Sequence, residues 1–466
     1  MKWFIYNCLF FVVYLAMMPM FLLRMKRRGG YRARMGDRFG KYPQEVIDAT
    51  NHESRTTSHE PRTTHHEPRT TNHEPRIWIH AVSVGEVQVA GQLMRAMRER
   101  DPAVRFVFST TSSTGWKQAE GQIGPEDVLI YNPLDFVGCV KRALDVVRPK
   151  AIVLTESEIW PNFIRAAKKR GIPLYIVNAR VSDRSAPRYR RLRWFFGEVL
   201  RAFSKIYAQS DLDAGRLVAA GADPATVEVT GSFKFDVAHR NPAKEVELRE
   251  WIGPGEILLG GSTWPGEDEV LLRIYSELLA SHPDVKLVIA PRHFEKADAV
   301  EANIRAAGFA CVRRSRGEKE AIGTNLKRHN CSQMANEKIG RSVFLADTTG
   351  EMMGLFGICT VAFVGKSLCA HGSQNMIEPC LCGKPTIVGP YTENFRPVMS
   401  DLLAGEAIIQ VQSEDELKGE VLRFFGDAGA RTALGARAEE AVRRRCGVVG
   451  RCADELLAAL RGGDAL

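Results

Sequence analysis

The sequence predicts an α/β protein with two doubly wound domains that follow an apolar N-terminal helix. Short apolar runs alternate with amphipathic stretches from Ile77 onward, and the pattern starts again after about residue 250. Apolar strands joined by helical crossovers are typical of a parallel sheet covered on both faces. The length of 466 residues also exceeds what one hydrophobic core usually serves. We therefore expect two Rossmann-like domains that face a cleft.

Fourteen apolar runs predict the strands. The first domain, residues 77–236, contains runs at 77–82, 104–109, 128–131, 151–155, 174–177, 206–208 and 227–229. The second domain, residues 237–466, contains runs at 257–259, 285–290, 310–312, 343–346, 360–364, 386–388 and 407–411. Amphipathic stretches such as 87–100 and 136–147 predict helices between strands. The polar stretch 317–340 is expected to be a surface insertion, and the helical stretch 430–460 is a candidate to pack back toward the first domain.

Residues 1–24 are expected to form a membrane anchor helix. Residues 3–23 are almost wholly apolar, carry no charge and are long enough to cross a bilayer. No small-residue cleavage site follows, which favours an anchor over a removed signal peptide. Asn7 and Pro19 leave open a helix that lies in the membrane interface instead of spanning.

The segment 25–50 is expected to be a basic juxtamembrane segment. The basic residues after the apolar stretch are Arg24, Lys26, Arg27, Arg28, Arg32 and Arg34. Basic flanks stay on the cytoplasmic side and attract anionic head groups. The bulk of the protein is therefore expected to face the cytoplasm, with anionic lipids as partners.

Residues 51–76 form a seven-residue repeat, NHESRTT, SHEPRTT, HHEPRTT and NHEPR. Five of the eleven histidines lie in it, so metal binding is one hypothesis. The unit has no apolar residue to bury, and its prolines block regular pairing. We interpret it as a flexible insert between the anchor and the catalytic body.

The composition narrows the possible partners. The net charge of +9 is compatible with an anionic membrane, an anionic substrate or nucleic acid. The sequence has no zinc finger and no RNA-binding signature, so we expect no nucleic-acid partner. The ten cysteines lack metal-ligand spacing, which favours reduced thiols in the cytoplasm.

Three glutamates are candidate acid–base groups of the first domain. Glu86 lies where a helix begins in HAVSVGEV (80–87), and Glu156 and Glu158 follow another strand in TESEIWPNF (155–163). Ligands of open parallel sheets bind at the carboxyl ends of strands, so we expect these carboxylates in one cleft. Several carboxylates there can divide acid, base and orienting roles. The alternatives are that Glu86 only caps its helix and that the other two mark a solvated helix start.

Four basic residues also follow predicted strands. Arg180 lies in NARVSDRS, Lys234 in GSFKFD, and Arg292 and His293 in APRH. Fixed cations at strand ends can neutralise a phosphate and a substrate carboxylate. Taken singly, each is more often a surface charge.

The segment 371–390, HGSQNMIEPCLCGKPTIVGP, predicts a nucleotide clamp in the second domain. We expect a helix to open near Ser373, where Gly372 and free N–H groups allow an anion to approach closely. Glu378, one to two turns inside, can accept hydrogen bonds from ribose hydroxyls. The alternative is an ordinary strand-to-helix connection with a solvated glutamate.

Five of these motifs, HAVSVGEV, TESEIWPNF, GSFKFD, APRH and the HGSQN…EP segment, in this order and behind an apolar anchor, resemble the Kdo transferases of lipopolysaccharide synthesis. Such enzymes move 3-deoxy-D-manno-octulosonic acid (Kdo) from CMP-Kdo to the lipid A precursor. The resemblance implies a GT-B architecture and an inverting reaction that uses no metal and no cofactor. It also implies a location at the inner membrane, with the catalytic domains on the cytoplasmic face. The rival interpretations are a GT-B transferase for another nucleotide sugar and an inactive membrane-bound nucleotide-binding protein.

The resemblance also implies roles for individual residues. Glu86 matches the presumed base, and the Glu156/Glu158 cluster contains a second essential glutamate. The nucleotide site corresponds to Arg292, Ser367, Asn375 and Glu378. The chain departs from the usual family pattern at Gly365-Lys366-Ser367, at His371-Gly372-Ser373-Gln374-Asn375 and at Asp347-Thr348-Thr349-Gly350-Glu351.

Overall fold

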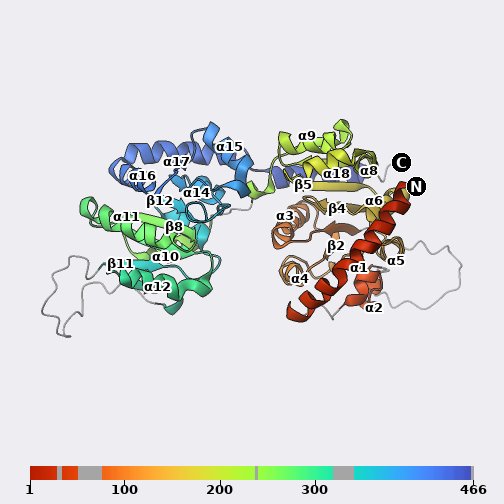
Figure 1. The fold of residues 1–466 in the computed structure, drawn as a ribbon, viewed down its shortest axis with the longest axis horizontal. Coiled ribbons are helices and arrows are strands. Elements are labelled where there is room, and N and C mark those ends of the chain that lie inside the picture. The colour runs from red at the N-terminus through yellow and green to blue at the C-terminus, as the bar shows by residue number, and fades with distance from the viewer. Residues whose placement is uncertain (29–33, 51–75, 237–239, 318–340, 463–466) are drawn as a thin grey trace, which may run out of the picture. The chain divides into compact units, whose positions relative to one another are not determined.

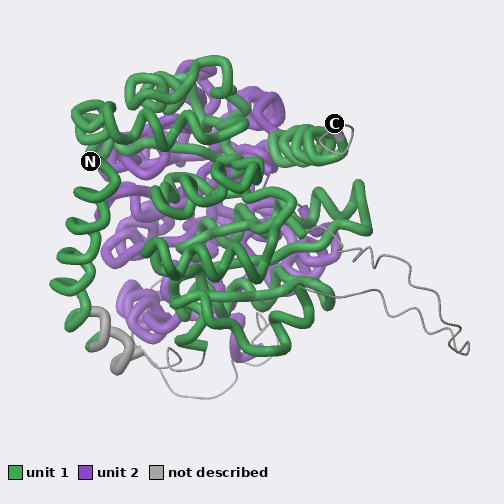
Figure 2. The backbone as a smooth tube through the Cα atoms, turned by 90° about the vertical axis from the view of Figure 1, so that its right-hand side faces the viewer, with its two compact units in different colours: residues 1–233, 447–466 green, residues 234–446 purple. Residues whose placement is uncertain are grey.

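The computed structural model describes residues 1–28, 34–50, 76–236, 240–317 and 341–462. The chain forms two compact units, coloured separately in Figure 2. Unit 1 contains residues 1–233 and 447–466, and unit 2 contains residues 234–446. Each unit is described by itself.

Unit 1 is built on a seven-stranded parallel sheet with the order β3-β2-β1-β4-β5-β6-β7. Its strands are β1 (Arg76–His80), β2 (Arg105–Thr110), β3 (Val128–Tyr131), β4 (Ala151–Thr155), β5 (Leu174–Ala179), β6 (Lys205–Ala208) and β7 (Val227–Val229). Two apolar clusters cover its two faces, because successive side chains of each strand point to opposite sides. Trp78 contributes to one cluster, while Ile77 and Ile79 contribute to the other.

Helices surround this sheet (Figure 1). They are α1 (Lys2–Arg28), α2 (Gln44–Thr50), α3 (Val84–Arg100), α4 (Ser113–Glu120), α5 (Val137–Val147), α6 (Pro161–Lys169), α7 (Ala186–Arg191), α8 (Arg193–Leu200), α9 (Asp211–Ala219) and α18 (Val448–Gly462). Among the described residues, one helix is long and apolar enough to cross a membrane, over Lys2–Met20 of α1. The expected N-terminal apolar helix is therefore present.

Unit 2 contains a second seven-stranded parallel sheet, with the order β10-β11-β9-β8-β12-β13-β14. Its strands are β8 (Ile257–Thr263), β9 (Lys286–Pro291), β10 (Ala310–Arg313), β11 (Ser342–Leu345), β12 (Val361–Val364), β13 (Thr386–Val388) and β14 (Ile409–Gln410). Its helices are α10 (Pro242–Ile252), α11 (Glu267–Ser281), α12 (Ala297–Ala306), α13 (Met352–Ile358), α14 (Ile377–Leu381), α15 (Arg396–Ala404), α16 (Glu414–Gly426) and α17 (Ala428–Arg443). All fourteen predicted strands are present, and the two doubly wound domains are confirmed.

Both sheets have a topological switch point, where the direction of strand addition reverses. It lies between β1 and β4 in unit 1 and between β8 and β12 in unit 2. Ligands of doubly wound sheets bind in the crevice at the carboxyl ends of these strands. The same two regions carry the predicted acidic and glycine-containing motifs.

The second unit differs from the predicted domain 237–466 at both ends. It begins at Lys234, and the chain returns to unit 1 after Cys446. Helix α18 buries Cys452, Leu456 and Leu460 in the cluster that also holds α3. The apolar face of this helix needs that partner surface, which explains why the C-terminal residues leave the second unit. The suggestion that the last helical stretch packs toward the first domain is correct for α18.

The predicted insert ends one residue too late. Residues 51–75 lie outside the described residues, as do the expected surface insertion from residue 318 and basic position 32. Arg76 is instead the first residue of β1 and is buried. Its guanidinium donates to the carbonyl oxygens of Ala49 and Glu126, so it belongs to the folded body.

Candidate active site

Glu86 lies at the unit 1 switch point in the first turn of α3. Ser83 caps this helix, because its hydroxyl accepts from the Glu86 backbone N–H. The Glu86 carboxylate in turn accepts from the Ser83 hydroxyl at 2.9 Å and from the Val82 N–H at 2.9 Å. This is a variant of the capping box. The Thr155 hydroxyl, at the end of β4, lies 3.4 Å from the same carboxylate. Glu86 therefore caps a helix and also faces the neighbouring strand.

Glu156 and Glu158 lie in the turn directly after β4. Glu156 has a positive φ of 53°, which turns the chain sharply, and its side chain is nearly buried. Arg180 pairs with it, at 2.7 Å between Nε and Oε2, and Asn178 contributes a longer contact of 3.4 Å. Arg180 was predicted to bind the donor, but in unit 1 it neutralises one member of the acidic cluster.

Glu158 is the carboxyl group with the most perturbed protonation in this cluster. Burial, together with the nearby negative charges of Glu86 and Glu156, raises its pKa to about 7. Trp160 partly offsets this shift by donating from its indole N–H at 3.0 Å. The three predicted glutamates are thus close enough to influence one another, and one of them can exchange a proton near neutral pH.

His80 is a site residue that the sequence prediction missed, although it is the first residue of the HAVSVGEV motif. Its ring is fully buried, and burial lowers its pKa to about 4, so the ring is neutral. Nδ1 contacts the Ser109 carbonyl and hydroxyl oxygens at 3.1 and 2.9 Å. In the described part of the chain, Nε2 has no hydrogen-bond partner and lies 3.9 Å from Oε2 of Glu158. The signal in the sequence was the position of His80 at the end of a predicted strand, just before the turn that leads to Glu86.

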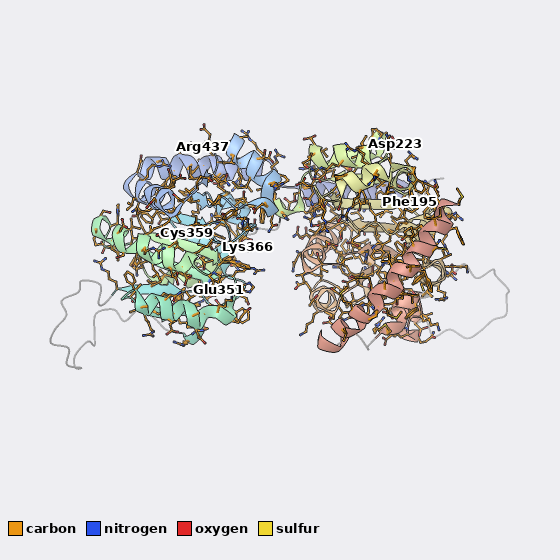
Figure 3. All side chains as sticks on the ribbon, in the orientation of Figure 1. Phe195, Asp223, Glu351, Cys359, Lys366 and Arg437 are labelled. Carbon is orange, nitrogen blue, oxygen red and sulfur yellow. The ribbon has the colours of Figure 1, made fainter. Side chains whose placement is uncertain are left out.

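Unit 2 has a small pocket at the carboxyl ends of β8, β9 and β11. Arg292 and Phe294 line it from the loop after β9, Ser262 lines it from β8, and residues 348–352 line it from the start of α13. Arg292 is exposed at this pocket, as an anion-binding residue requires. Glu351 lies at the same place, and Arg314 and Lys244 pair with it (Glu351 is labelled in Figure 3).

Asn375 and Glu378 lie together at the start of α14. The Asn375 amide donates to Glu378 at 2.9 Å, and its oxygen accepts from the Ile377 N–H. Burial raises the pKa of Glu378, and the hydrogen bond from Asn375 opposes this shift. Neither residue lines the pocket at Arg292. Arg292 and the Asn375–Glu378 pair, all predicted to bind the nucleotide, therefore lie at different places in unit 2.

The predicted helix opening at Ser373 is wrong. Ser373 has a φ of 61°, and its N–H donates to the Lys366 carbonyl oxygen at 2.7 Å. A non-glycine residue in this left-handed region cannot begin an α-helix, so the helix starts four residues later. Helix α14 has only five residues, Ile377–Leu381. An anion-binding helix N-terminus at Ser373 is therefore absent.

Ser367 is also placed differently from the prediction. It is fully buried, and its hydroxyl donates to the Val364 carbonyl oxygen and accepts from the Gly389 N–H. Its backbone N–H donates to Glu267. The serine joins β12 to β13 and has no free group to offer a ligand.

The backbone N–H groups of this loop point toward Glu267. Its fully buried carboxylate, in the first turn of α11, accepts from the backbone N–H groups of Lys366 at 2.8 Å, Ser367 at 3.0 Å and Leu368 at 3.1 Å. The Trp264 N–H donates to it as well. Successive N–H groups that converge in this way form an anion-binding nest. In this protein the nest formed by residues 366–368 is filled by the protein's own carboxylate.

Lys234 and His293, the remaining predicted cations, have aromatic or acidic neighbours, as does Lys366 in the loop after β12. Lys234 lies 4.7 Å from the centre of the Phe395 ring. Lys366, labelled in Figure 3, lies 4.7 Å from the centre of the Trp264 ring. His293 contacts Glu295 at 3.2 Å. Arg292 is thus the predicted cation that borders the unit 2 pocket.

Comparison with known proteins identifies the family. Residues 33–237 match the family model described as 3-deoxy-D-manno-octulosonic-acid transferase (kdotransferase). The chain is 32% identical over 384 residues to the 3-deoxy-D-manno-octulosonic acid transferase of Haemophilus influenzae, covering 82% of this chain and 86% of the relative. The corresponding enzyme of Bordetella pertussis is 33% identical over 393 residues, with the same coverage. The chain belongs to this family.

As a member of the Kdo transferase family, the chain is a glycosyltransferase, and the resemblance found in its motifs is confirmed. Solved structures agree at the level of fold. The UDP-GlcNAc 2-epimerase of Neisseria meningitidis superposes with a TM-score of 0.54 at 11% identity, covering 83% of this chain and 100% of that chain. Anabaena Alr3699/HepE in complex with UDP gives 0.52 at 12% identity, with the same coverage. The two parallel-sheet domains of this Kdo transferase family member therefore have the GT-B architecture.

Proposed function

We propose that the protein transfers Kdo from CMP-Kdo to the lipid A precursor, with inversion at the anomeric carbon. Family membership supports the sugar and the donor, since the relatives are named 3-deoxy-D-manno-octulosonic acid transferases. The observation that carries the mechanism is the group of three glutamates at the unit 1 switch point, of which one pairs with Arg180. Its proposed place of action is the cytoplasmic face of the inner membrane.

Glu86 is the proposed general base. Hydrogen bonds from Ser83 and Val82 hold its carboxylate in one orientation. In the proposed reaction this carboxylate takes the proton from an acceptor hydroxyl, which then attacks the anomeric carbon of Kdo from the face opposite CMP. Such a reaction passes through an oxocarbenium-like transition state, which nearby carboxylates stabilise. Glu158 in its ionised form would supply that negative field, since Glu156 is already paired with Arg180.

The nucleotide is assigned to unit 2 in this proposal. Arg292 would contact the phosphate of CMP, and Asn375 and Glu378 would hold the ribose hydroxyls. Arg180 and Lys234 remain candidates for the Kdo carboxylate. Ser367 contributes only by fixing the loop between β12 and β13, because its hydroxyl is already used within the protein.

Two substitutions test whether unit 1 supplies the general base and unit 2 binds the nucleotide. Glu86→Gln is expected to lower transfer by about two to four powers of ten, while CMP affinity stays unchanged. The amide oxygen of glutamine can still accept from Val82 or Ser83, so the helix cap is retained. Glu378→Ala is expected to weaken CMP binding by roughly 1.5–3 kcal/mol for one lost charged hydrogen bond.

The measurements are calorimetric CMP titration and mass analysis of lipid A precursor incubated with CMP-Kdo. Ser83→Ala is the control for Glu86, since it removes the cap and leaves the carboxylate. Full transfer by Glu86→Gln would overturn the mechanism, and unchanged CMP affinity in Glu378→Ala would overturn the ribose contact. Transfer from UDP-sugars instead of CMP-Kdo would favour the other donor class.

A further inference from the structure

Helix α1 is attached to unit 1 along one of its faces. Trp3, Tyr6, Phe10 and Tyr14 recur at helical spacing and therefore share this face. Trp3 and Tyr6 pack on Phe195, with ring centres 5.4 and 5.3 Å apart (Phe195 is labelled in Figure 3). Further along, Phe10 and Tyr14 pack on Phe136 at 5.0 and 5.2 Å. The contacts extend over three turns of the helix.

Specific polar contacts join the same face to the domain. The Trp3 indole donates to Glu198 at 2.9 Å, and the Tyr6 hydroxyl donates to the buried Asp135 at 2.7 Å. Asn162 donates to Asn7 at 2.7 Å. Asp135 also accepts from the backbone N–H groups of Asn162 and Phe163, so the contact reaches the start of α6.

These contacts are incompatible with a helix that crosses a bilayer while it stays docked. A spanning α1 would carry Asp135, Asn162 and Glu198 into the hydrocarbon or break their bonds. Buried charges and unsatisfied polar groups in the hydrocarbon each cost several kcal/mol. The docked face therefore argues for a helix that remains beside unit 1.

The opposite face of α1 is apolar and exposed. The exposed large side chains that point away from unit 1 by helical spacing include Phe4, Ile5, Leu9, Val12 and Leu15. The exposed apolar surface extends round the helix through Phe11, Val13, Met17, Met20 and Leu23, and Phe11 also contacts the Phe136 ring. Figures 1 and 2 show α1 on the outside of unit 1, with one side toward the sheet and its helices and the other turned away. An apolar surface of this length is unusual for a protein that meets only water.

Neighbouring elements extend this surface and add positive charge. Val137, beside Phe136, is 57% exposed, and Leu192 and Trp194, beside Phe195, are 41% and 57% exposed. The same α7–α8 segment carries four exposed arginines: Arg188, Arg190, Arg191 and Arg193. Within the described residues, none of these four pairs with a carboxylate. An aromatic and aliphatic surface flanked by unpaired arginines complements the interface of an anionic bilayer.

We infer that α1 lies in the plane of the membrane interface and forms, with Val137, Leu192, Trp194 and the four arginines, a docking surface for anionic lipid. The helix does not cross the bilayer. This inference deepens the proposed membrane location, and it is tested without measuring sugar transfer, so either can fail alone.

Depth measurements distinguish an in-plane helix from a spanning one. Ile5→Cys and Met20→Cys, in a Cys8→Ser, Cys369→Ser background, carry an environment-sensitive fluorophore in vesicles of phosphatidylcholine and phosphatidylglycerol. The two positions are fifteen residues apart, or about 22 Å along the helix axis. Quenching by spin-labelled lipids should give depths within about 5 Å of each other for a helix in the plane. A difference of about 15 Å or more would overturn the inference.

Vesicle flotation tests the surface itself with the full chain. Replacing Leu192 and Trp194 by serine should lower binding about tenfold or more, because two apolar side chains leave the interface. Leu403→Ser is the matched control, since Leu403 is 42% exposed in unit 2. Replacing the four arginines by glutamine should weaken binding to anionic vesicles and reduce its salt sensitivity, with neutral vesicles little affected.

Equal losses for Leu403→Ser and for the Leu192/Trp194 pair would contradict the proposed surface. A dimer that forms without vesicles and excludes them would assign α1 to a second copy of the chain instead.

Discussion

At the scale of single residues, the acidic cluster of unit 1 has a cost in stability. Glu158 is partly buried beside two other carboxyl groups, and this burial and the neighbouring charges raise its pKa to about 7. In the unfolded chain the same carboxyl titrates in its usual range near 4.5. The folded protein therefore binds more protons than the unfolded chain between these two pH values. Its stability should fall as the pH rises through this window, and the loss is complete above pH 7.

Glu158→Gln is expected to remove this pH-dependent loss. The variant should be more stable than the parent by on the order of 1–3 kcal/mol at pH 8 and equally stable near pH 4. Urea unfolding at the two pH values measures the difference. Glu99→Gln, at an exposed position on α3, is the control. If Glu158→Gln destabilised the protein at pH 8, the carboxyl would have to be a stabilising ion in the folded state.

His80 shows why this cluster could be predicted only in part. The three glutamates were identifiable because charged residues after apolar strands are conspicuous in sequence. His80 is the last residue of β1, and its place before a charged turn did not show which groups its ring would meet. Its position 3.9 Å from Glu158 depends on the pairing of β1 with β4, two strands separated by 70 residues.

At the scale of elements, the two switch points share one structural feature, a glutamate at the start of a helix. In each unit, a glutamate in the first turn of the helix that follows the first strand reaches toward the strand across the switch point. Glu86, in the helix after β1, faces Thr155 at the end of β4. Glu267, in the helix after β8, accepts from the loop after β12. Both glutamates follow a glycine, in SVGE at 83–86 and WPGE at 264–267. Gly-Glu also occurs elsewhere in the sequence, so only its position after the predicted strand at 257–259 could have pointed to Glu267.

Glu267→Gln is expected to loosen the loop after β12. The carboxylate accepts several backbone N–H bonds, and a neutral amide presents only one acceptor oxygen. The free energy of unfolding should fall by about 2–3 kcal/mol, with weaker CMP binding as the neighbouring loop loses its support. Thermal unfolding and CMP titration measure both effects. Glu269→Gln, exposed in the same helical turn, should be close to neutral, and a similar loss in that variant would assign the effect to the helix dipole instead of the loop.

At the scale of the whole molecule, the chain leaves unit 1 at Lys234 and returns at Gly447. Helix α18 is thus separated from the rest of unit 1 by more than 200 residues of sequence, yet it completes the apolar cluster on one face of the first sheet. The insert after residue 50 is a second excursion, and its ends are tied by Arg76, which donates to the Ala49 carbonyl oxygen at 2.8 Å.

Because Arg76 joins the two ends of the insert, removing the insert with and without Arg76 should have different effects. Replacing residues 51–75 by a short Gly/Ser linker should leave thermal stability and transfer activity nearly unchanged, since the ends of the segment are already joined by Arg76. The same replacement extended to Arg76 should cost about 2–4 kcal/mol, because it removes a buried cation with two backbone partners. Calorimetry and the transfer assay compare the two variants. Equal behaviour of both would show that Arg76 is not the anchor of β1.

The positions of the strands, the two doubly wound domains and the family could all be predicted from the sequence. These features depend on local patterns, namely apolar runs for strands and short motifs at their carboxyl ends. The hydrogen-bond partners of the residues in those motifs became known only from the folded structure. Ser373 turns back to Lys366, Ser367 is enclosed between two strands, and Glu267 occupies the amides of a loop 99 residues later. The sequence around a backbone N–H does not show which distant carboxylate will accept its hydrogen bond. The two groups come together only when the chain folds.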